Sequence, residues 1–506
     1  MKRSRVFTVS IALLLAAVVL SSPGGVAHAA GPPSGIVEYV AITLTNSQSA
    51  PTPTNFQQQL TVDWSTYSAY LASNVQNVEF FTTQWSPLYA WCESSCSSSG
   101  TSSSVWVNLG TNTIPAGGTL TVVMGFYSTS TSEYSSTGYW GAYPTFTGTY
   151  GQYDNGANVF LVYNNGASLF GTSQTGTGGT APATTASAPT PNSNAITGSV
   201  SGGTSDATTW TTNGETTPAL PASYIAQMRV YLTGSAPLTD LLTNVQSIST
   251  GQFYVFRIDA RGNEYDGIGY YPSGATATTF LDYTSIASTV DTWYQLTAVD
   301  AGDSLSLYKS TSTGIDSFGT LEAGPVAGKG YTGGGIAVST DGATSTDYWT
   351  DIVVRSYPPS GVMPSATFAS PSSAFATPVA YSDSGCTTSS TSFDMGQYVY
   401  GGFTVAGSGG TPWSFNIIDQ VPANVKSVSP ISSSPYCDSA GYQIPSSGSS
   451  GTWTIEVLDT NGVNIGQVSF AVNNVQIPDL PSGVLFLLLP VVALYMLSRR
   501  RARVGY

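Results

Sequence analysis

Histidine is nearly absent from this chain of 506 residues. The only copy, His28, lies in the N-terminal segment 1–29, in which basic residues precede an apolar run and small residues offer a cleavage site. That arrangement predicts a secretory signal peptide, which is removed from the mature protein. The mature chain then has no imidazole, which excludes Ser-His-Asp triads, Cys-His dyads and histidine metal sites.

Basic residues are also scarce, and half of them lie at the two ends of the chain. The predicted ectodomain keeps seven Lys and Arg against 28 Asp and Glu, and none of the seven precedes Arg229. A surface of this sign repels phosphate backbones, so nucleic acid is excluded as a partner. Cations, extracellular glycans and other cell-envelope components remain compatible partners.

Long apolar runs are confined to the ends. The second covers residues 480–497 and is followed by the arginine-rich segment 498–506. It predicts a transmembrane helix with a cytoplasmic basic tail, so the protein would cross the cell membrane once with its ectodomain outside. The "IPDLPSG" before it also resembles the sorting signals of exosortase-like transpeptidases, and such processing would remove the tail.

Cysteine occurs four times, always in the predicted ectodomain. An oxidising exterior favours disulfides. Cys92 and Cys96 in "WCESSC" would close a short loop, and Cys386 and Cys437 would cross-link one C-terminal module. A thiolate metal site is the alternative, although the two pairs are far apart in the sequence.

Gly, Ser, Thr and Tyr are abundant, and apolar residues alternate with polar ones throughout the ectodomain. Such alternation is typical of strands, and no amphipathic helix is evident between the two apolar ends. An ectodomain of about 450 residues suggests about three domains. We therefore predict an all-β fold of tandem antiparallel β-sandwiches.

The first module spans residues 35–127 and contains four alternating runs. Its segments "ITLTNSQSAPTPTNFQQQLTVDW", "VEFFTTQWSPLYAW", "SVWVNL" and "IPAGGTLTVVMGFY" resemble the domain of unknown function 2341 family, found on prokaryotic surface proteins, and an archaeal source is compatible with this. The "CESSC" after the tryptophan departs from the usual form of that family. The resemblance implies no activity.

A tyrosine-rich connector follows at residues 128–157. Its aromatic residues Tyr139, Trp140 and Tyr143 are candidates for stacking on the apolar faces of sugar rings. The alternative, which we favour, is that the connector's rings cover a seam between two sandwiches.

The second module covers residues 158–357. "TWYQLTAVDAGDSLSLY", which is predicted to be a strand hairpin, "GGGIAVST" and "DYWTDIVVRSYPP" resemble the concanavalin A-like superfamily, laminin-G-like domains included. That resemblance implies a jelly roll whose terminal strand, 349–355, pairs near its first strand. Tyr270 and Tyr271 are further candidates for stacking on a ligand. Residues 171–194 have few large apolar side chains and are predicted to be a disordered insertion.

The third module covers residues 365–475, next to the predicted membrane helix. Its short alternating runs and its cysteine pair resemble an immunoglobulin-like sandwich. A hairpin turn is expected at the "TNG" of residues 460–462.

Glycosidases of concanavalin A-like fold require a pair of carboxylates close together. One family of this fold uses Glu-x-Asp followed two or three positions later by Glu. Glu264 and Asp266 match the first two acids on one face of a predicted strand, but Ile268 or Gly269 occupies the position of the final Glu. The acid/base partner is missing, so the protein is predicted not to be an enzyme and to require no cofactor.

Calcium is the ion that an oxygen-rich surface of this kind would bind. The candidate ligands are Asp300 with Asp303, Asp347 with Asp351, and Asp154. Each of these residues could instead form a turn, because Asp bonds its own backbone in turns.

The sequence thus predicts a non-catalytic, membrane-anchored cell-surface protein that acts in adhesion or carbohydrate binding through its second module. Two alternatives remain open, an extracellular glycoside hydrolase or lyase and a structural component of the cell envelope.

Overall fold

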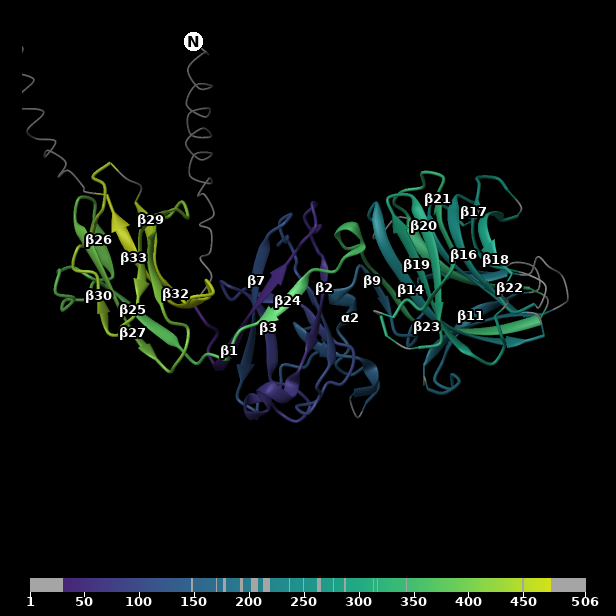
Figure 1. Cartoon of the computed structure of the whole chain (residues 1–506), viewed down its shortest axis with the longest axis horizontal. Helices are drawn as coiled ribbons and strands as arrows, with labels where there is room; N and C mark the ends of the chain where they lie inside the picture. Colours follow the sequence, from purple (N-terminus) through teal and green to yellow (C-terminus); the bar gives the residue numbers. More distant parts are fainter. Residues whose placement is uncertain are drawn as a thin grey trace, which may run out of the picture. The chain divides into compact units, whose positions relative to one another are not determined.

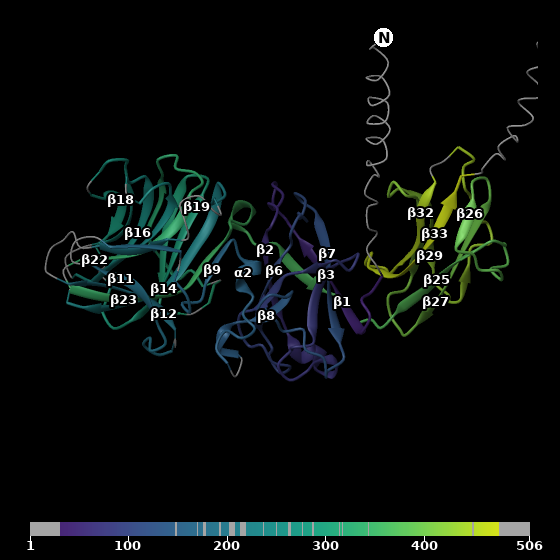
Figure 2. The same cartoon turned by 180° about the vertical axis from the view of Figure 1, so that it is seen from behind.

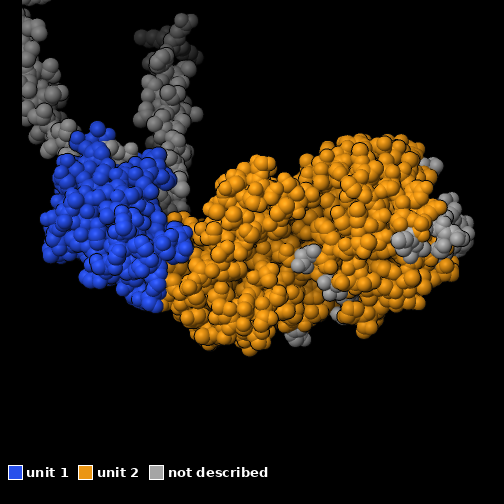
Figure 3. Space-filling view, viewed as in Figure 1, with its two compact units in different colours: residues 1–32, 374–506 blue, residues 33–373 orange. Residues whose placement is uncertain are grey.

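The computed structural model describes residues 31–474, except for residues 147–148, 170, 176–178, 192–193, 202–207, 213–218, 236, 249, 262–264, 276, 286–287, 313, 316, 343 and 448–449. These residues form two compact units, unit 2 at residues 33–373 and unit 1 at residues 31–32 and 374–474 (Figure 3). The predicted signal peptide, transmembrane helix and basic tail lie outside the described residues. In the part of the chain that is described, no helix combines the length and the apolar character needed to cross a membrane.

The prediction of an all-β fold is confirmed, because strands dominate both units (Figure 1). The described helices are short: η1 (Trp64–Tyr70), η2 (Pro144–Phe146), α2 (Gly156–Val159) and η3 (Pro359–Gly361).

Unit 2 begins with a sandwich of two sheets, called here the first sandwich. One sheet has the order β24 (Ser365–Phe368), β1 (Ile36–Thr45), β7 (Thr119–Tyr127), β3 (Val78–Thr82), β4 (Pro87–Leu88). The other has the order β2 (Gln57–Val62), β6 (Ser103–Asn108), β5 (Ala90–Cys92), β8 (Trp140–Ala142). The apolar side chains of the predicted alternating runs point into the core, as in β1, where Val40, Ile42 and Leu44 are fully buried.

The first sandwich is larger than the module expected at residues 35–127. The connector supplies its strand β8, which runs parallel to β5. β24, from the segment expected to begin the third module, pairs with β1 through Ile42 and Phe368. The chain therefore leaves the first sandwich, forms a second one, and returns to complete the first.

The second sandwich is built from two larger sheets, and many of their strands are labelled in Figures 1 and 2. One has the order β10 (Thr172–Thr175), β13 (Thr208–Thr212), β22 (Gly335–Gly342), β15 (Pro237–Val245), β16 (Phe253–Asp259), β17 (Asp266–Tyr271), β18 (Thr279–Thr284). The other has the order β11 (Gly179–Thr185), β12 (Ala195–Ser201), β23 (Thr344–Ser356), β14 (Ser223–Gly234), β19 (Trp293–Ala301), β20 (Ser304–Ser310), β21 (Thr320–Ala327), with β9 (Val162–Asn164) also paired to β23.

Two expectations for this region are met, and one is corrected. The predicted hairpin is β19–β20, with Gly302 and Asp303 at positive φ in its turn. The terminal strand β23 pairs with β9, the first strand of this sandwich. Strands β10 and β11 lie in the segment predicted to be disordered. They are stabilised by backbone pairing to β13 and β12, which requires few apolar side chains.

Unit 1 is also a two-sheet β-sandwich. One sheet contains β25 (Phe375–Tyr381), β27 (Tyr398–Ala406) and β30 (Tyr436–Cys437), with β31 (Tyr442–Gln443) beside β27. The other has the order β26 (Ser392–Asp394), β33 (Asn464–Asn473), β32 (Gly451–Leu458), β28 (Trp413–Ile418), β29 (Asn424–Ile431). The turn expected at residues 460–462 joins β32 to β33, with Gly462 at positive φ.

Both predicted disulfides are present, Cys92–Cys96 and Cys386–Cys437. The second joins the loop after β25 to strand β30 of the same sheet. This differs from the bond between two sheets that is typical of antibody domains.

Candidate functional site

A cavity of about 360 Å³ lies within unit 2, between the first and second sandwiches. Trp91 and Glu93 reach it from the first sandwich, and Tyr143 reaches it from the connector. The sheet of β14, β19 and β23 supplies the polar side chains of its other wall: Gln227, Arg229, Gln295 and Asp351.

An apolar seam beside the cavity holds the two sandwiches together. Its buried residues come from the first sandwich, from the end of α2 and the residue after it, and from the second sandwich: Trp91, Trp106, Val159, Phe160, Ile315 and Val353. The guanidinium of Arg355, on β23, lies 5.0 Å from the ring centroid of Trp106, on β6. The attraction between a cation and an indole face stabilises a desolvated contact by about 1–2 kcal/mol.

Glu93 occupies the short loop that Cys92 and Cys96 close. Its Oε2 accepts hydrogen bonds from Trp106 Nε1 at 2.8 Å and from Ser104 Oγ at 2.9 Å. Its Oε1 accepts one at 2.5 Å from the backbone N–H of Ile315, in the second sandwich. This carboxylate thus links the two walls of the cavity.

Asp351 stands opposite, at an irregularity in strand β23. The register to β14 shifts between Gln227 and Arg229, and Asp351 has a positive φ of 49°. Such a conformation costs a non-glycine residue about 1–3 kcal/mol and is concentrated at functional sites. The bulge turns the carboxylate toward Tyr143, whose hydroxyl lies 3.0 and 2.9 Å from its two oxygens, and toward Arg229 Nη1 at 3.5 Å. Burial raises the pKa of Asp351, and the charge of Arg229 opposes this.

Asp154, a calcium candidate from the sequence, is instead fully engaged by protein donors. Its carboxylate accepts from Trp91 Nε1 at 2.9 Å, from the Tyr163 hydroxyl at 2.8 Å and from Asn165 Nδ2 at 2.7 Å. The backbone N–H of Gly156 donates at 3.1 Å. Burial raises the pKa of Asp154, and these donors oppose the rise. They join the first sandwich, the connector and β9.

Gln227 is the exception among the polar residues of the wall. Its Nε2 donates to Thr297 Oγ1 at 2.9 Å, but its Oε1 is buried and has no hydrogen-bond partner. A buried acceptor without a donor costs about 1–3 kcal/mol. Because this oxygen has almost no surface open to solvent, it meets a ligand in the cavity only when the side chain turns toward it.

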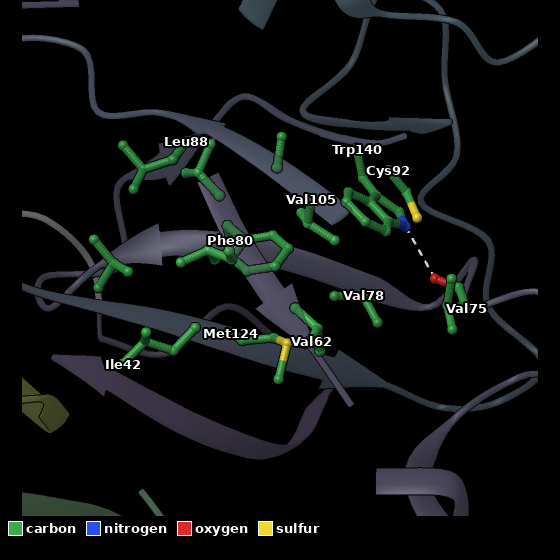
Figure 4. Packing of buried hydrophobic residues seen from close by; sticks show 14 of the residues in the cluster. Ile42, Val62, Val75, Val78, Phe80, Leu88, Cys92, Val105, Met124 and Trp140 are labelled. Carbon is green, nitrogen blue, oxygen red and sulfur yellow. Dashed lines mark hydrogen bonds between the residues drawn. The ribbon is translucent and has the colours of Figure 1, made fainter. Parts of the chain in front are cut away.

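The three aromatic candidates of the connector have different positions. Tyr143 lines the cavity. Tyr139 is 38% exposed and stacks on Tyr89 with 4.6 Å between ring centroids. Trp140 is fully buried in the first sandwich, where its Nε1 donates to the Val75 carbonyl (Figure 4). Its ring is covered by protein and cannot stack on a ligand.

Tyr270 and Tyr271 lie on the sheet of β17 and do not line the cavity. The ring of Tyr270 faces the ammonium of Lys329 at 5.1 Å, and that of Tyr271 stacks on Phe253 at 5.0 Å. Their role in ligand stacking stays a prediction.

Asp266, one of the two candidate catalytic acids, does not line this cavity. Glu264 lies outside the described residues. Asp266 is fully buried and contacts Lys309, and its Oδ1 accepts from the backbone N–H of Asp259 at 2.8 Å. These partners are those of a structural residue.

Two of the calcium candidates, Asp347 and Asp351, lie on opposite faces of one sheet. Asp347 pairs in register with Leu232 and faces the core of the second sandwich, whereas Asp351 faces the cavity on the other side of the sheet. They cannot share an ion. Asp300 Oδ1 accepts from the Asp303 N–H at 2.7 Å within the β19–β20 turn, whereas Asp303 Oδ1 accepts from the Tyr254 hydroxyl at 2.6 Å.

Burial raises the pKa of Asp300 to about 6. Among the described residues, no group of three or more His, Cys, Asp or Glu side chains could hold a metal ion. Calcium binding stays a prediction.

Sequence reasoning missed most of the residues that line the cavity, among them Glu93, Gln227 and Arg229. The sequence did mark Glu93 as unusual, because it lies between two cysteines in the "CESSC" segment, where this chain departs from the family that the first module resembles. It also marked Arg229, as the first basic residue after the N-terminal segment. Gln227 is one of many polar residues in alternating strands, and nothing in its spacing marks it.

No protein-family model matches this chain, and no curated protein matches it. The similar solved structures include the carbohydrate-binding module CBM66 from Bacillus subtilis, with 13% identity, 37% of this chain and 97% of that chain covered, and a TM-score of 0.28. The VIP36 exoplasmic/lumenal domain bound to Ca²⁺ and Man3GlcNAc has 9% identity, coverage of 41% and 100%, and a TM-score of 0.27. The carbohydrate esterase vb_24B_21 from Shiga toxin-encoding bacteriophage phi24B has 14% identity, coverage of 39% and 98%, and a TM-score of 0.24. Likenesses this low do not indicate a function for this chain.

Proposed function

We propose that this chain is a non-catalytic cell-surface protein that binds carbohydrate, and that the cavity between its two sandwiches holds one sugar unit of an extracellular glycan. The observation that carries the proposal is the unpaired Oε1 of Gln227 on the cavity wall. A sugar hydroxyl is a donor that satisfies such an acceptor and accepts other hydrogen bonds through the same oxygen.

The size and lining of the cavity support a sugar. Its volume of about 360 Å³ lies within the range of small-molecule sites. Trp91, Tyr143 and Tyr163 offer apolar ring surface, while Gln227 and Gln295 offer amide groups. This mixture suits a ring that has hydroxyls at its edge and C–H groups on its faces.

Charge favours a neutral sugar over an acidic one. Two carboxylates, Glu93 and Asp351, line the cavity with one guanidinium, Arg229. The ectodomain as a whole is strongly acidic. An anionic sugar would approach against this negative field.

The pair of carboxylates also raises the alternative of a glycosidase, since such enzymes use two acids in one cleft. Both acids are already engaged by protein donors. Glu93 accepts from Trp106, Ser104 and Ile315, and Asp351 from Tyr143 and Arg229. Such engagement favours binding over turnover. Hydrolysis of a polysaccharide that is lost in Glu93→Gln would favour the enzyme instead.

The proposed location is the outer face of the cell membrane, held by the predicted helix at residues 480–497. Binding to glycans of another cell or of the envelope would then amount to adhesion. Self-assembly of the purified protein, combined with failure to bind any glycan, would favour the structural alternative.

The test is a glycan array with the purified full chain, with and without a calcium chelator, followed by calorimetry on the best neutral glycan. Gln227→Leu removes the unpaired acceptor but keeps the volume, and it should weaken binding about tenfold, or ~1.4 kcal/mol. Gln48→Leu, on the surface of the first sandwich and outside the cavity, is the control and should bind normally. Equal binding by both variants would refute this assignment of the site, and a chelator effect would establish the calcium prediction separately.

A further inference from the structure

A buried lysine contacts two carboxyl groups in the second sandwich. Lys309 on β20 contacts Asp266 at the start of β17, and its Nζ lies 3.7 Å from Oε1 of Glu322 on β21. The three side chains are only 10%, 0% and 7% exposed. β17 belongs to one sheet, while β20 and β21 belong to the other, so the cluster bridges the two sheets.

The carboxyl group of Asp266 is held on both oxygens. Its Oδ1 accepts from the backbone N–H of Asp259 at 2.8 Å, and its Oδ2 accepts from Ser288 Oγ at 3.1 Å and from Lys309. Lys309 Nζ also donates to Ser288 Oγ at 3.2 Å and lies 5.4 Å from the ring centroid of Tyr294. Amine and carboxyl therefore meet in a fixed geometry with little access to water.

We infer that Lys309 and Asp266 form an intramolecular amide bond that covalently joins the two sheets of the second sandwich, with Glu322 as the proton-transfer group. Such a bond is independent of glycan binding. It would prevent β17 and β20 from separating when the domain unfolds. This suits a domain that is exposed to pulling forces and proteases outside the cell.

The reaction balances without a cofactor, oxidant or reductant. A proton passes from the Lys309 ammonium to the Asp266 carboxylate, leaving a neutral amine and a neutral acid. Nζ attacks Cγ, and Glu322 takes a proton from the nitrogen and delivers it to Oδ2, which leaves as water. One C–N bond forms and one C–O bond breaks.

Three features of the site favour this step. Contact between amine and carboxyl replaces an encounter in solution, which is worth many orders of magnitude in effective concentration. The Asp259 N–H points at Oδ1, where negative charge develops in the tetrahedral intermediate. Burial raises the pKa of both Asp266 and Glu322, which favours the neutral acid and a carboxyl able to shuttle protons.

Trypsin offers a direct test, because it cleaves after Lys and Arg. No basic residue lies between Arg261 and Lys309, or between Lys309 and Lys329. The unlinked chain, after denaturation and reduction, therefore gives separate peptides 262–309 and 310–329. The linked chain gives one peptide, 262–329, that is lighter than the unlinked sequence by one water molecule, because an amidated lysine is not cleaved.

Variants of the full chain separate the amide from an ordinary ion pair. Lys309→Arg keeps the charge but cannot form this bond, so cleavage after residue 309 and the full mass should return. Glu322→Gln keeps the shape and the lysine, and it should leave the bond unformed. Complete cleavage after Lys309 with no loss of water in the wild-type chain would overturn the inference, as would an unchanged linked peptide in Glu322→Gln.

Discussion

Buried aspartates of unit 2 differ in what surrounds them. Asp154 accepts hydrogen bonds from several buried donors, and Asp351 faces a guanidinium and a phenol. Asp347 is also fully buried, but neither of its oxygens accepts a hydrogen bond. The hydroxyls of Thr239 and Thr340 lie close enough to oppose the rise in its pKa, but their hydrogen bonds go to backbone carbonyls at 2.8 and 3.3 Å.

We expect Asp347→Asn to stabilise the second sandwich at neutral pH. Burial, and then the charge of Asp240, raise the pKa of Asp347 well above its usual value. The folded state thus holds this proton more tightly than the unfolded chain, so its stability is greatest below ~pH 4 and decreases as pH rises. The variant should remove that loss, gaining about 1–3 kcal/mol at pH 7.

Chemical denaturation of both proteins at pH 4 and pH 7 measures this difference. The exposed Asp291→Asn, on the same sandwich, is the matched control and should leave stability unchanged at both values. A variant less stable than the wild type at pH 7 would show that a donor reaches Asp347 in solution.

Local elements of this protein follow directly from residue patterns. The hairpin β19–β20 was predictable because its apolar side chains alternate up to a turn of Gly302 and Asp303, which adopt the positive φ that such a turn needs. Strands β10 and β11 were not predictable, because their stabilising partners are backbone groups of β13 and β12. A strand at a sheet edge needs little apolar signal of its own.

The two disulfides are expected to act on different properties. Cys386–Cys437 spans 51 residues and should stabilise unit 1 by about 4 kcal/mol through the entropy of the unfolded chain, whereas Cys92–Cys96 spans four and should contribute about 2 kcal/mol. Serine pairs at each bond, compared by thermal unfolding, should rank in that order.

The Cys92–Cys96 disulfide has a second expected effect, because the loop that it closes contains Glu93. Cys92→Ser with Cys96→Ser should weaken glycan binding, while the serine pair at Cys386 and Cys437 should leave it unchanged. The reverse ranking in calorimetry would show that the loop does not depend on its disulfide.

On the scale of the whole molecule, the decisive feature is the seam within unit 2. The chain leaves the first sandwich through the connector and returns to it as β24. The predicted role of connector rings as a seam cover agrees with Tyr143 and Tyr150, which bond to Asp351 and to the Asn165 carbonyl. The module boundaries drawn from sequence missed both crossings, because each crossing segment is short.

Asp154→Ala should loosen this seam. It leaves the buried donors of Trp91, Tyr163 and Asn165 without their acceptor, and each orphaned donor costs about 1–3 kcal/mol. Calorimetric unfolding of unit 2 should begin at a lower temperature and separate into two transitions. Asp394→Ala, in unit 1, removes a carboxylate away from the seam and should leave the unit 2 transition in place. An unaltered transition in Asp154→Ala would mean that the apolar seam suffices.

The sequence by itself determined the residue composition of this protein and, through its alternating pattern, the all-β class of its fold. One histidine, few cations, four cysteines and alternating strands are properties of single residues and of their neighbours along the chain, and they predict an all-β fold whose mature form lacks imidazole. Only the tertiary structure decided which side chains meet. Glu93 reaches Ile315, Tyr143 reaches Asp351, and Lys309 reaches Asp266 across sheets, and such contacts depend on packing and register that no local pattern records.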